Sequence, residues 1–279
     1  MRLFAFADEA SASLDGQIAA MRRNGLNGLE IRNVEGTNVS DLPLNAAKEI
    51  RARLNDAGLV VWSIGSPIGK IRVTDDFDAH RARFLHTLEV AELLGARNIR
   101  LFSFYPGENM GAEAFRDAAF ERLNALLNAA GDTDIALCHE NEKGIYGDTA
   151  PRCAEIHAAF PKLKAIFDPA NFIQCGQETL SAWEMLKGHV QYLHIKDALS
   201  NGTVVPAGKG EGHLTEILTD FVSRGGTAVT IEPHLKVFDG LNALELDSAR
   251  SAVDDYQYKT TDSAFDAACA ALRKVLEGI

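Results

Sequence analysis

The amino-acid sequence predicts an α/β protein with a single (β/α)8 barrel, known as a TIM barrel. Short apolar runs typical of strands alternate eight times with longer amphipathic runs typical of helices. A chain of 279 residues is a usual length for one such barrel. No linker rich in Pro, Gly or Ser divides the chain, so we expect one domain over residues 1–279.

The expected strands are short and rich in large apolar residues, as strands buried on both faces are. They cover residues 3–7, 28–31, 60–64, 98–102, 135–138, 165–167, 190–194 and 228–231. Apolar residues at helical spacing predict helices over 14–24, 44–57, 78–94, 112–130, 149–159, 179–186, 214–223 and 261–276.

Turn residues indicate how these elements connect. Gly25, Gly58, Gly95 and Gly225 each follow a predicted helix and fit the left-handed conformation that often ends helices. The first strand leads into a turn at residues 8–11 that contains no glycine. An open doubly wound sheet usually has a Gly-rich phosphate turn there, so a closed barrel is favoured.

One long irregular connection, at about 238–259, separates the last strand from the last helix. We expect a long loop or small insertion, with a short helix around 243–251. Loops of this length at the C-terminal face of a barrel often cover the ligand. A lid and a plain surface insertion both fit the sequence.

Composition limits the classes of partner. The net charge of −11 disfavours nucleic acid and anionic membrane surfaces. The apolar start of the chain is interrupted at Asp8, too early for a signal peptide or a membrane span. Four cysteines without a CxxC pair suit a reducing compartment. We therefore expect a cytoplasmic protein with no nucleic-acid or membrane partner, and a homo-oligomer is compatible with the sequence.

Three carboxylates and one imidazole stand at the ends of four successive expected strands. Glu140, Asp168, His194 and Glu232 are separated by 28, 26 and 38 residues, roughly one strand-helix unit each. Alone, such a residue is more often a helix cap or a core group. Because barrel active sites lie at the C-terminal ends of the strands, all four can meet at one point. Oxygen and imidazole ligands predict one divalent ion, with Mn²⁺ as the leading candidate and Mg²⁺, Co²⁺ or Zn²⁺ as alternatives.

The segments around these residues resemble a known family. They are His139-Glu-Asn-Glu, Phe167-Asp-Pro-Ala-Asn-Phe, Leu193-His-Ile-Lys-Asp and Thr230-Ile-Glu-Pro-His. Together they are similar to the sugar phosphate isomerase/epimerase-like TIM barrels, the xylose-isomerase-like superfamily that also contains endonuclease IV. The resemblance implies that Glu140, Asp168, His194 and Glu232 hold a metal, and that Glu140 and Glu232 are also the catalytic acid/base pair.

Five further residues are candidates for binding a polyhydroxylated substrate. Glu30 and Trp62 lie on the second and third strands, Asn171 follows Asp168 by three residues, and Lys196 follows His194 by two. In the family, the Asn171 position often binds substrate. Glu211 lies in a glycine-rich stretch, 208–213, that resembles a family loop but lacks the GK[ST] of a Walker loop. For Trp62, barrel packing is slightly favoured over a role in covering the sugar ring.

His139, Glu142 and His234 flank the expected ligands. We expect them to orient those ligands; for Glu142 and His234, a solvent-facing loop residue is an equally good interpretation.

The leading hypothesis is a metal-dependent isomerase or epimerase of a small sugar, keto-sugar or cyclitol. Such a reaction removes a proton next to a carbonyl and passes through an enediolate. A dehydratase or lyase acting on a keto-sugar or inosose would use the same first step. An endonuclease IV-like enzyme is less favoured, because Asn171 stands where that enzyme has a metal-binding histidine. A non-catalytic sugar-binding protein is the remaining alternative.

Overall fold

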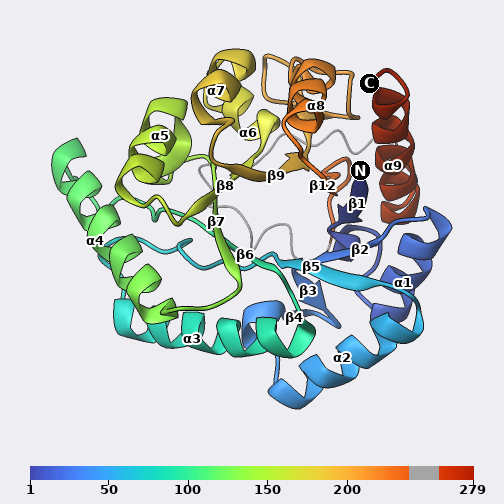
Figure 1. Cartoon of the computed structure of the whole chain (residues 1–279), viewed down its shortest axis with the longest axis horizontal. Coiled ribbons are helices and arrows are strands. Elements are labelled where there is room, and N and C mark those ends of the chain that lie inside the picture. Colours follow the sequence, from blue (N-terminus) through green and yellow to red (C-terminus); the bar gives the residue numbers. More distant parts are fainter. Residues whose placement is uncertain (239–257) are drawn as a thin grey trace.

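A computed structural model of the chain, which describes residues 1–238 and 258–279, confirms the predicted (β/α)8 barrel. Within these residues, eight parallel strands close into a ring in the order β1-β12-β9-β8-β7-β6-β5-β2, and helices surround them (Figure 1). The strands are β1 (Arg2–Ala5), β2 (Gly28–Ile31), β5 (Val60–Ile64), β6 (Asn98–Leu101), β7 (Ala136–Glu140), β8 (Lys164–Phe167), β9 (Val190–Ile195) and β12 (Ala228–Ile231).

The eight expected helices are present with ends within about two residues of their predicted positions. They are α1 (Leu14–Arg23), α2 (Leu44–Asp56), α3 (Phe77–Leu94), α4 (Ala112–Ala130), α5 (Ala150–Ala159), α7 (Thr179–Leu186), α8 (Leu214–Ser223) and α9 (Thr261–Leu276). Short elements that the sequence analysis did not identify lie in the loops: α6 (Pro169–Gln174), β3 (Asn33–Val34), β4 (Thr37–Asn38), β10 (Asp197–Ala198), β11 (Val204–Val205) and three short 3₁₀ turns, Ala7–Glu9, Val39–Asp41 and Tyr146–Asp148.

Local chemistry explains several helix ends. The Ser13 side chain accepts a hydrogen bond from the Gly16 amide at the start of α1, and Thr260 begins α9 with a capping box. Gly95 ends α3 with a φ of 72°, so the left-handed glycine cap predicted there is confirmed. The predicted lid and the short helix around 243–251 lie within 239–257, outside the described residues.

The barrel interior is apolar in its lower part, near the N-terminal ends of the strands, and polar in its upper part, near their C-terminal ends. Near the N-terminal ends of the strands, Phe4 stacks on Trp62 with ring centroids 5.0 Å apart, and Tyr192 packs edge-on against Trp62. Side chains alternate along a strand, so the inward residue two positions after Tyr192 is His194. The same alternation places charged residues in the upper interior, where the strands end.

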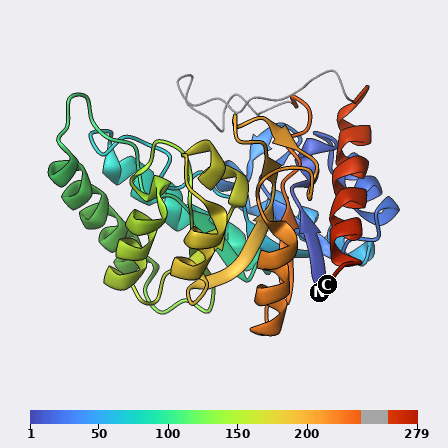
Figure 2. The same ribbon diagram turned by 90° about the horizontal axis from the view of Figure 1, so that it is seen from above.

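Seen from the side, both chain termini lie at the same end of the barrel, where the strands begin (Figure 2). Within the described residues, no helix combines the length and the apolarity that crossing a membrane requires.

Candidate active site

The four predicted ligands meet at the C-terminal end of the barrel. Glu140 is the last residue of β7, Asp168 and Glu232 directly follow β8 and β12, and His194 is the penultimate residue of β9. These are four consecutive strands of the barrel, so their ends are neighbours. One ligand atom from each side chain lies within 4.8 Å of the others, and all four residues are buried.

Hydrogen bonds fix the orientation of His194. Its Nδ1 lies 2.7 Å from Glu140 Oε1 and 3.4 Å from Glu232 Oε2, so this nitrogen faces the other ligands. Its Nε2 lies 3.0 Å from Glu30 Oε2. Glu30 Oε1 also accepts a hydrogen bond of 2.9 Å from the Tyr192 hydroxyl. Glu30 therefore holds the far side of the imidazole, the arrangement that orients a metal-binding histidine.

Asp168 is held with one oxygen directed at the cluster. Its Oδ1 accepts a hydrogen bond of 3.0 Å from the Asn171 amide, and Asn141 Nδ2 donates to its backbone carbonyl. Its Oδ2 is buried without a hydrogen bond, although the Lys196 ammonium lies 2.8 Å away. Three buried carboxylates and an imidazole nitrogen that converge on one point fit a hard divalent cation.

Two cations contact the ligand carboxylates directly. Arg100, on β6, donates from Nη1 to Glu140 Oε2 at 3.0 Å, and the same nitrogen lies 3.8 Å from Glu232 Oε1. Lys196, beyond β9, donates from Nζ to Glu232 Oε2 at 3.1 Å. Both side chains are at most 4% exposed. Because a buried charge needs a partner, these contacts compensate the negative charge of the carboxylates.

A second group of charges adjoins Glu232. The Arg32 guanidinium donates to Asp8 Oδ2 at 2.9 Å and Glu9 Oε1 at 3.1 Å, and its Nη1 lies 3.4 Å from Glu232 Oε1. Glu9 Oε2 accepts a hydrogen bond of 2.7 Å from the His234 amide. His234 has a φ of 44°, a left-handed conformation that is uncommon outside glycine, and the rigid Glu9 contact helps to hold it.

The burial of these groups and their neighbours shift their pKa values. Burial raises the pKa of Asp168 to about 7 against the opposing effect of Lys196, and raises the pKa of Glu9 to about 8 against that of Arg32. Burial also opposes ionisation of Glu232, but Lys196 and the two histidines outweigh it and hold its pKa well below the usual value. Glu232 is therefore an ionised carboxylate at neutral pH.

A family model described as xylose isomerase-like TIM barrel matches residues 18–259. The chain belongs to this family. A comparison with curated proteins gives no match.

Solved structures share the fold of this xylose isomerase-like barrel at low sequence identity. D-psicose 3-epimerase in the presence of D-fructose has a TM-score of 0.77 and 20% identity over 100% of both chains. The probable 3-DHS dehydratase AsbF from Bacillus anthracis has a TM-score of 0.73 and 16% identity, over 98% of this chain and 99% of that chain. The IOLI protein with a bound zinc atom has a TM-score of 0.73 and 13% identity, over 99% and 98%.

The predicted substrate-binding residues of this xylose isomerase-like barrel occupy different environments. Lys196 lines a small cavity directly above the ligands. Glu30 lies below them against His194. Trp62 packs lower in the barrel, and Asn171 bonds to Asn141 and Asp168. Glu211 lies on the exposed glycine-rich loop. Contact with substrate stays a prediction for each of them.

Asp197 organises that glycine-rich loop. Its carboxylate accepts hydrogen bonds from the amides of Gly208, Gly210 and Gly212 at 2.9 to 3.0 Å. A Cβ at Gly210 would lie 2.4 Å from Asp197 Oδ1, which explains the need for glycine there. Among the residues that flank the ligands, Glu142 and His234 line the cavity, whereas His139 lies behind the strands against Ser103.

Sequence reasoning missed Arg32 and Arg100. Both occupy inward positions: Arg32 directly follows β2, as Asp168 follows β8, and Arg100 lies two residues after the inward Asn98. An arginine inside a four-residue buried strand is itself a signal, because charged residues are rarely buried without a partner. The alternation of side chains along the strands could have identified both.

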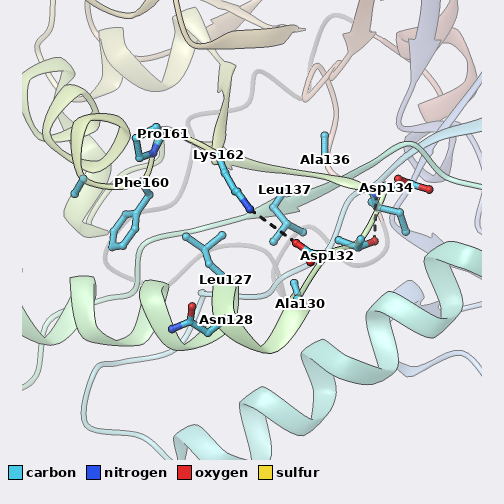
Figure 3. A pocket seen from close by; sticks show the side chains of 14 residues that line it. Leu127, Asn128, Ala130, Asp132, Asp134, Ala136, Leu137, Phe160, Pro161 and Lys162 are labelled. Atoms are coloured by element: carbon cyan, nitrogen blue, oxygen red, sulfur yellow. Dashed lines mark hydrogen bonds and ion pairs between the residues drawn. The ribbon is translucent and has the colours of Figure 1, made fainter.

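Another cavity lies away from this site. It measures about 550 Å³ and lies beside the start of β7, between the end of α4 and the loop after α5 (Figure 3). Leu127, Leu137 and Phe160 line it together with Asp132 and Lys162, whose charged groups are 3.9 Å apart. Because barrel chemistry takes place at the opposite end of the strands, this cavity is separate from the candidate active site.

Proposed function

We propose that the protein is a divalent-metal-dependent isomerase or epimerase of a small sugar, keto-sugar or cyclitol. The observation that carries the proposal is the buried set of Glu140, Asp168, His194 and Glu232, with ligand atoms within 4.8 Å at the C-terminal end of the barrel. The sugar epimerases among the structures of the same fold support it. Fold alone does not determine a reaction, so the argument rests on the site.

The two glutamates suit proton transfer at the carbon next to a carbonyl. Glu140 and Glu232 come from β7 and β12, which β8 and β9 separate, so they approach a substrate from different directions. Glu232, whose pKa is held low, is the ionised base that would remove the proton. Glu140, which accepts a hydrogen bond from Arg100, would take a proton from solvent and deliver it to the opposite face of the same carbon, while Glu232 releases its proton to solvent. A divalent cation held by the four ligands would supply positive charge that stabilises the enediolate oxygens.

Burial supports the same chemistry. Glu140, Asp168, His194 and Glu232 are all at most 3% exposed, so bulk water has little access to the site. Exclusion of water strengthens electrostatic contacts and protects a reactive intermediate.

We propose Mn²⁺ as the preferred ion, because three carboxylates favour a harder cation. The four cysteines are free thiols, which supports the proposed cytoplasmic location.

A dehydratase or lyase is the second candidate, and Lys196 favours it. The Lys196 ammonium lies 2.8 Å from Asp168 and 3.1 Å from Glu232. After proton removal, a positioned ammonium can protonate a hydroxyl group as it leaves as water. One structure of the same fold is described as a probable dehydratase.

The experiment combines metal analysis with solvent exchange. Metal content is measured by mass spectrometry for the wild type, Glu232→Gln and the matched surface variant Glu121→Gln. Each protein is then incubated in D₂O with ketoses, 3-keto sugars and inososes, and the products are followed by NMR. We expect one divalent ion per chain and deuterium incorporation that Glu232→Gln abolishes and Glu121→Gln retains.

The outcomes separate the hypotheses. Deuterium in the substrate or its epimer indicates an isomerase or epimerase, and a dehydrated product indicates a lyase. Three zinc ions per chain would support the nuclease hypothesis. Sugar binding without any exchange would contradict the proposal and support a non-catalytic binding protein.

A further inference from the structure

A second set of metal-type ligands adjoins the first. Glu9, Glu232 and His234 each offer one ligand atom, and these atoms lie within 4.8 Å of one another. The three residues are at most 4% exposed, and Glu232 belongs to both sets. Two carboxylates and an imidazole are ligands that Mn²⁺ and Zn²⁺ accept. Ligand type alone would therefore allow a second ion beside the first.

Arg32 already contacts the oxygens that such an ion would need. Its Nη2 donates to Glu9 Oε1 at 3.1 Å, and its Nη1 donates to Glu232 Oε1 at 3.4 Å. His234 Nε2 lies 3.4 Å and 3.6 Å from the same two oxygens. The guanidinium and an ion held by the second set would therefore compete for one place.

The Arg32 side chain is fixed in this position. Its Nε and Nη2 donate to the two oxygens of Asp8 at 2.9 and 3.1 Å. Its guanidinium carbon lies 4.4 Å from the centre of the Phe6 ring and 4.9 Å from that of Phe238. The side chain is 0% exposed, so water cannot take over its contacts. Because a guanidinium keeps its charge at every physiological pH, Arg32 is a permanent buried cation beside the second set.

His234 belongs to the second set, but its own ring has no hydrogen bond. Neither ring nitrogen makes one, although the residue is only 4% exposed. Buried polar atoms normally have a partner. The backbone amide of His234 donates to Glu9 Oε2 at 2.7 Å, so the imidazole is held beside the carboxylates. The ring is therefore placed to coordinate a cation, and the adjacent positive charge of Arg32 opposes one.

The contacts of Glu232 show how Arg32 affects the first set of ligands. Arg32 and Arg100 lie 3.4 Å and 3.8 Å from Glu232 Oε1. Lys196 Nζ and His194 Nδ1 lie 3.1 Å and 3.4 Å from Oε2. Glu232 thus has one oxygen facing the guanidinium groups and one facing the proposed metal site, and Arg32 is the closer of the two guanidinium groups.

We propose that Arg32 is a positioning residue that takes the place of a second divalent ion between Glu9, Glu232 and His234. Its fixed charge limits the site to one ion and directs Glu232 Oε2 at that ion. The inference rests on the proposed function for the binding of the first ion.

The number of bound ions tests the role of Arg32. Mn²⁺ bound per chain is measured for the wild type and Arg32→Met by titration, with the free ion followed by electron paramagnetic resonance. Met is similar to Arg in length and carries no charge. We expect one ion per chain at saturation in the wild type and two in Arg32→Met. Two ions this close are magnetically coupled, so the spectrum of the bound ions should change from that of isolated Mn²⁺ to that of a coupled pair.

Two further variants locate the second ion. Arg32→Met combined with His234→Gln should bind one ion again, because the imidazole of the second set is lost. His234→Gln alone should bind one ion with nearly unchanged affinity. These counts separate a second site at His234 from a general rise in Mn²⁺ binding.

Control variants separate the position of the charge from its loss. Arg32→Lys keeps a cation at the same place and should bind one ion. Arg53→Met removes a guanidinium whose side chain is 46% exposed and should also bind one ion. Circular dichroism checks that each variant is folded. If Arg32→Met does not fold, Arg32→Gln takes its place, since an amide can still donate to a carboxylate, and the ion count of the wild type still tests the inference.

Two ions per chain in the wild type would overturn the inference, because Arg32 would then not exclude the second ion. One ion in a folded Arg32→Met would overturn it too, as would a second ion that survives His234→Gln. A wild type without any bound ion would contradict the proposed function instead. An ion gained in Arg32→Met and lost with His234→Gln would support the role of Arg32 even in that case.

Discussion

Replacing Glu30 with Gln tests how the site holds its histidine. The Glu30 carboxylate is fully buried, and its Oε2 lies 3.0 Å from His194 Nε2. The other nitrogen of His194 faces Glu140 and Glu232. Burial opposes ionisation of Glu30, but the charge of His194 and its hydrogen bond keep the pKa of Glu30 below its usual value. Glu30 is therefore a buried anion whose main contact is the imidazole.

The expected effect is weaker metal binding. The amide of Gln has nearly the same shape as the carboxylate, so the change mainly removes the negative charge behind the imidazole. A hydrogen bond to a charged group contributes about 1.5–3 kcal/mol. Loss of such a partner behind a metal-binding histidine typically lowers metal affinity about 10–100-fold, which agrees with that free energy.

Titration with Mn²⁺, followed by electron paramagnetic resonance of the free ion, measures this change in affinity. Circular dichroism on the same samples checks that Glu30→Gln is folded. Ser63→Ala is the matched control, because Ser63 contacts Glu30 at 3.3 Å without touching His194. We expect the control to bind Mn²⁺ with nearly unchanged affinity. Unchanged Mn²⁺ affinity in Glu30→Gln, together with a raised KM, would refute this reasoning and show that Glu30 binds substrate, as the sequence suggests.

Three further predictions follow from other contacts. Asp197→Ala removes the carboxylate that accepts hydrogen bonds from three glycine amides. We expect the free energy of unfolding, measured by urea denaturation, to fall by at least about 2 kcal/mol. An unchanged free energy of unfolding would contradict the role of Asp197 in the loop. Burial lowers the pKa of His157 to about 4, so the folded state favours the neutral ring. The contribution of His157 to the free energy of unfolding is complete above about pH 6.5 and is lost as the pH falls toward 4. About 2 kcal/mol of this contribution is lost by pH 5. In His157→Gln, unfolding free energies at pH 7 and pH 5 should differ less than in the wild type, and an equal difference would exclude His157 as the cause. Removal of metal by a chelator should abolish solvent exchange and lower the melting temperature, and Mn²⁺ should restore both; exchange that persists in metal-free protein would exclude a metal-dependent reaction.

The sequence by itself determined the barrel. Strand and helix periodicities differ, so the alternation is visible along the chain, and glycines such as Gly95 mark where helices end. The candidate metal ligands could also be identified from the sequence, because Glu140, Asp168, His194 and Glu232 stand at strand ends, and a parallel barrel brings those ends together.

The tertiary structure decided which groups surround the ligands. Arg100 meets Glu140 across neighbouring strands, 40 residues apart in sequence, and Arg32 meets Glu232 across 200 residues. Contacts at such separations depend on how the barrel closes and on which rotamer each side chain adopts, and neither can be read from a local pattern. The position of Glu30 below His194, rather than in the cavity, depends on the same closure, because β2 and β9 are not paired strands. Sequence periodicity determined the level of each residue along the barrel axis. Packing across the barrel interior determined which side chain each residue contacts.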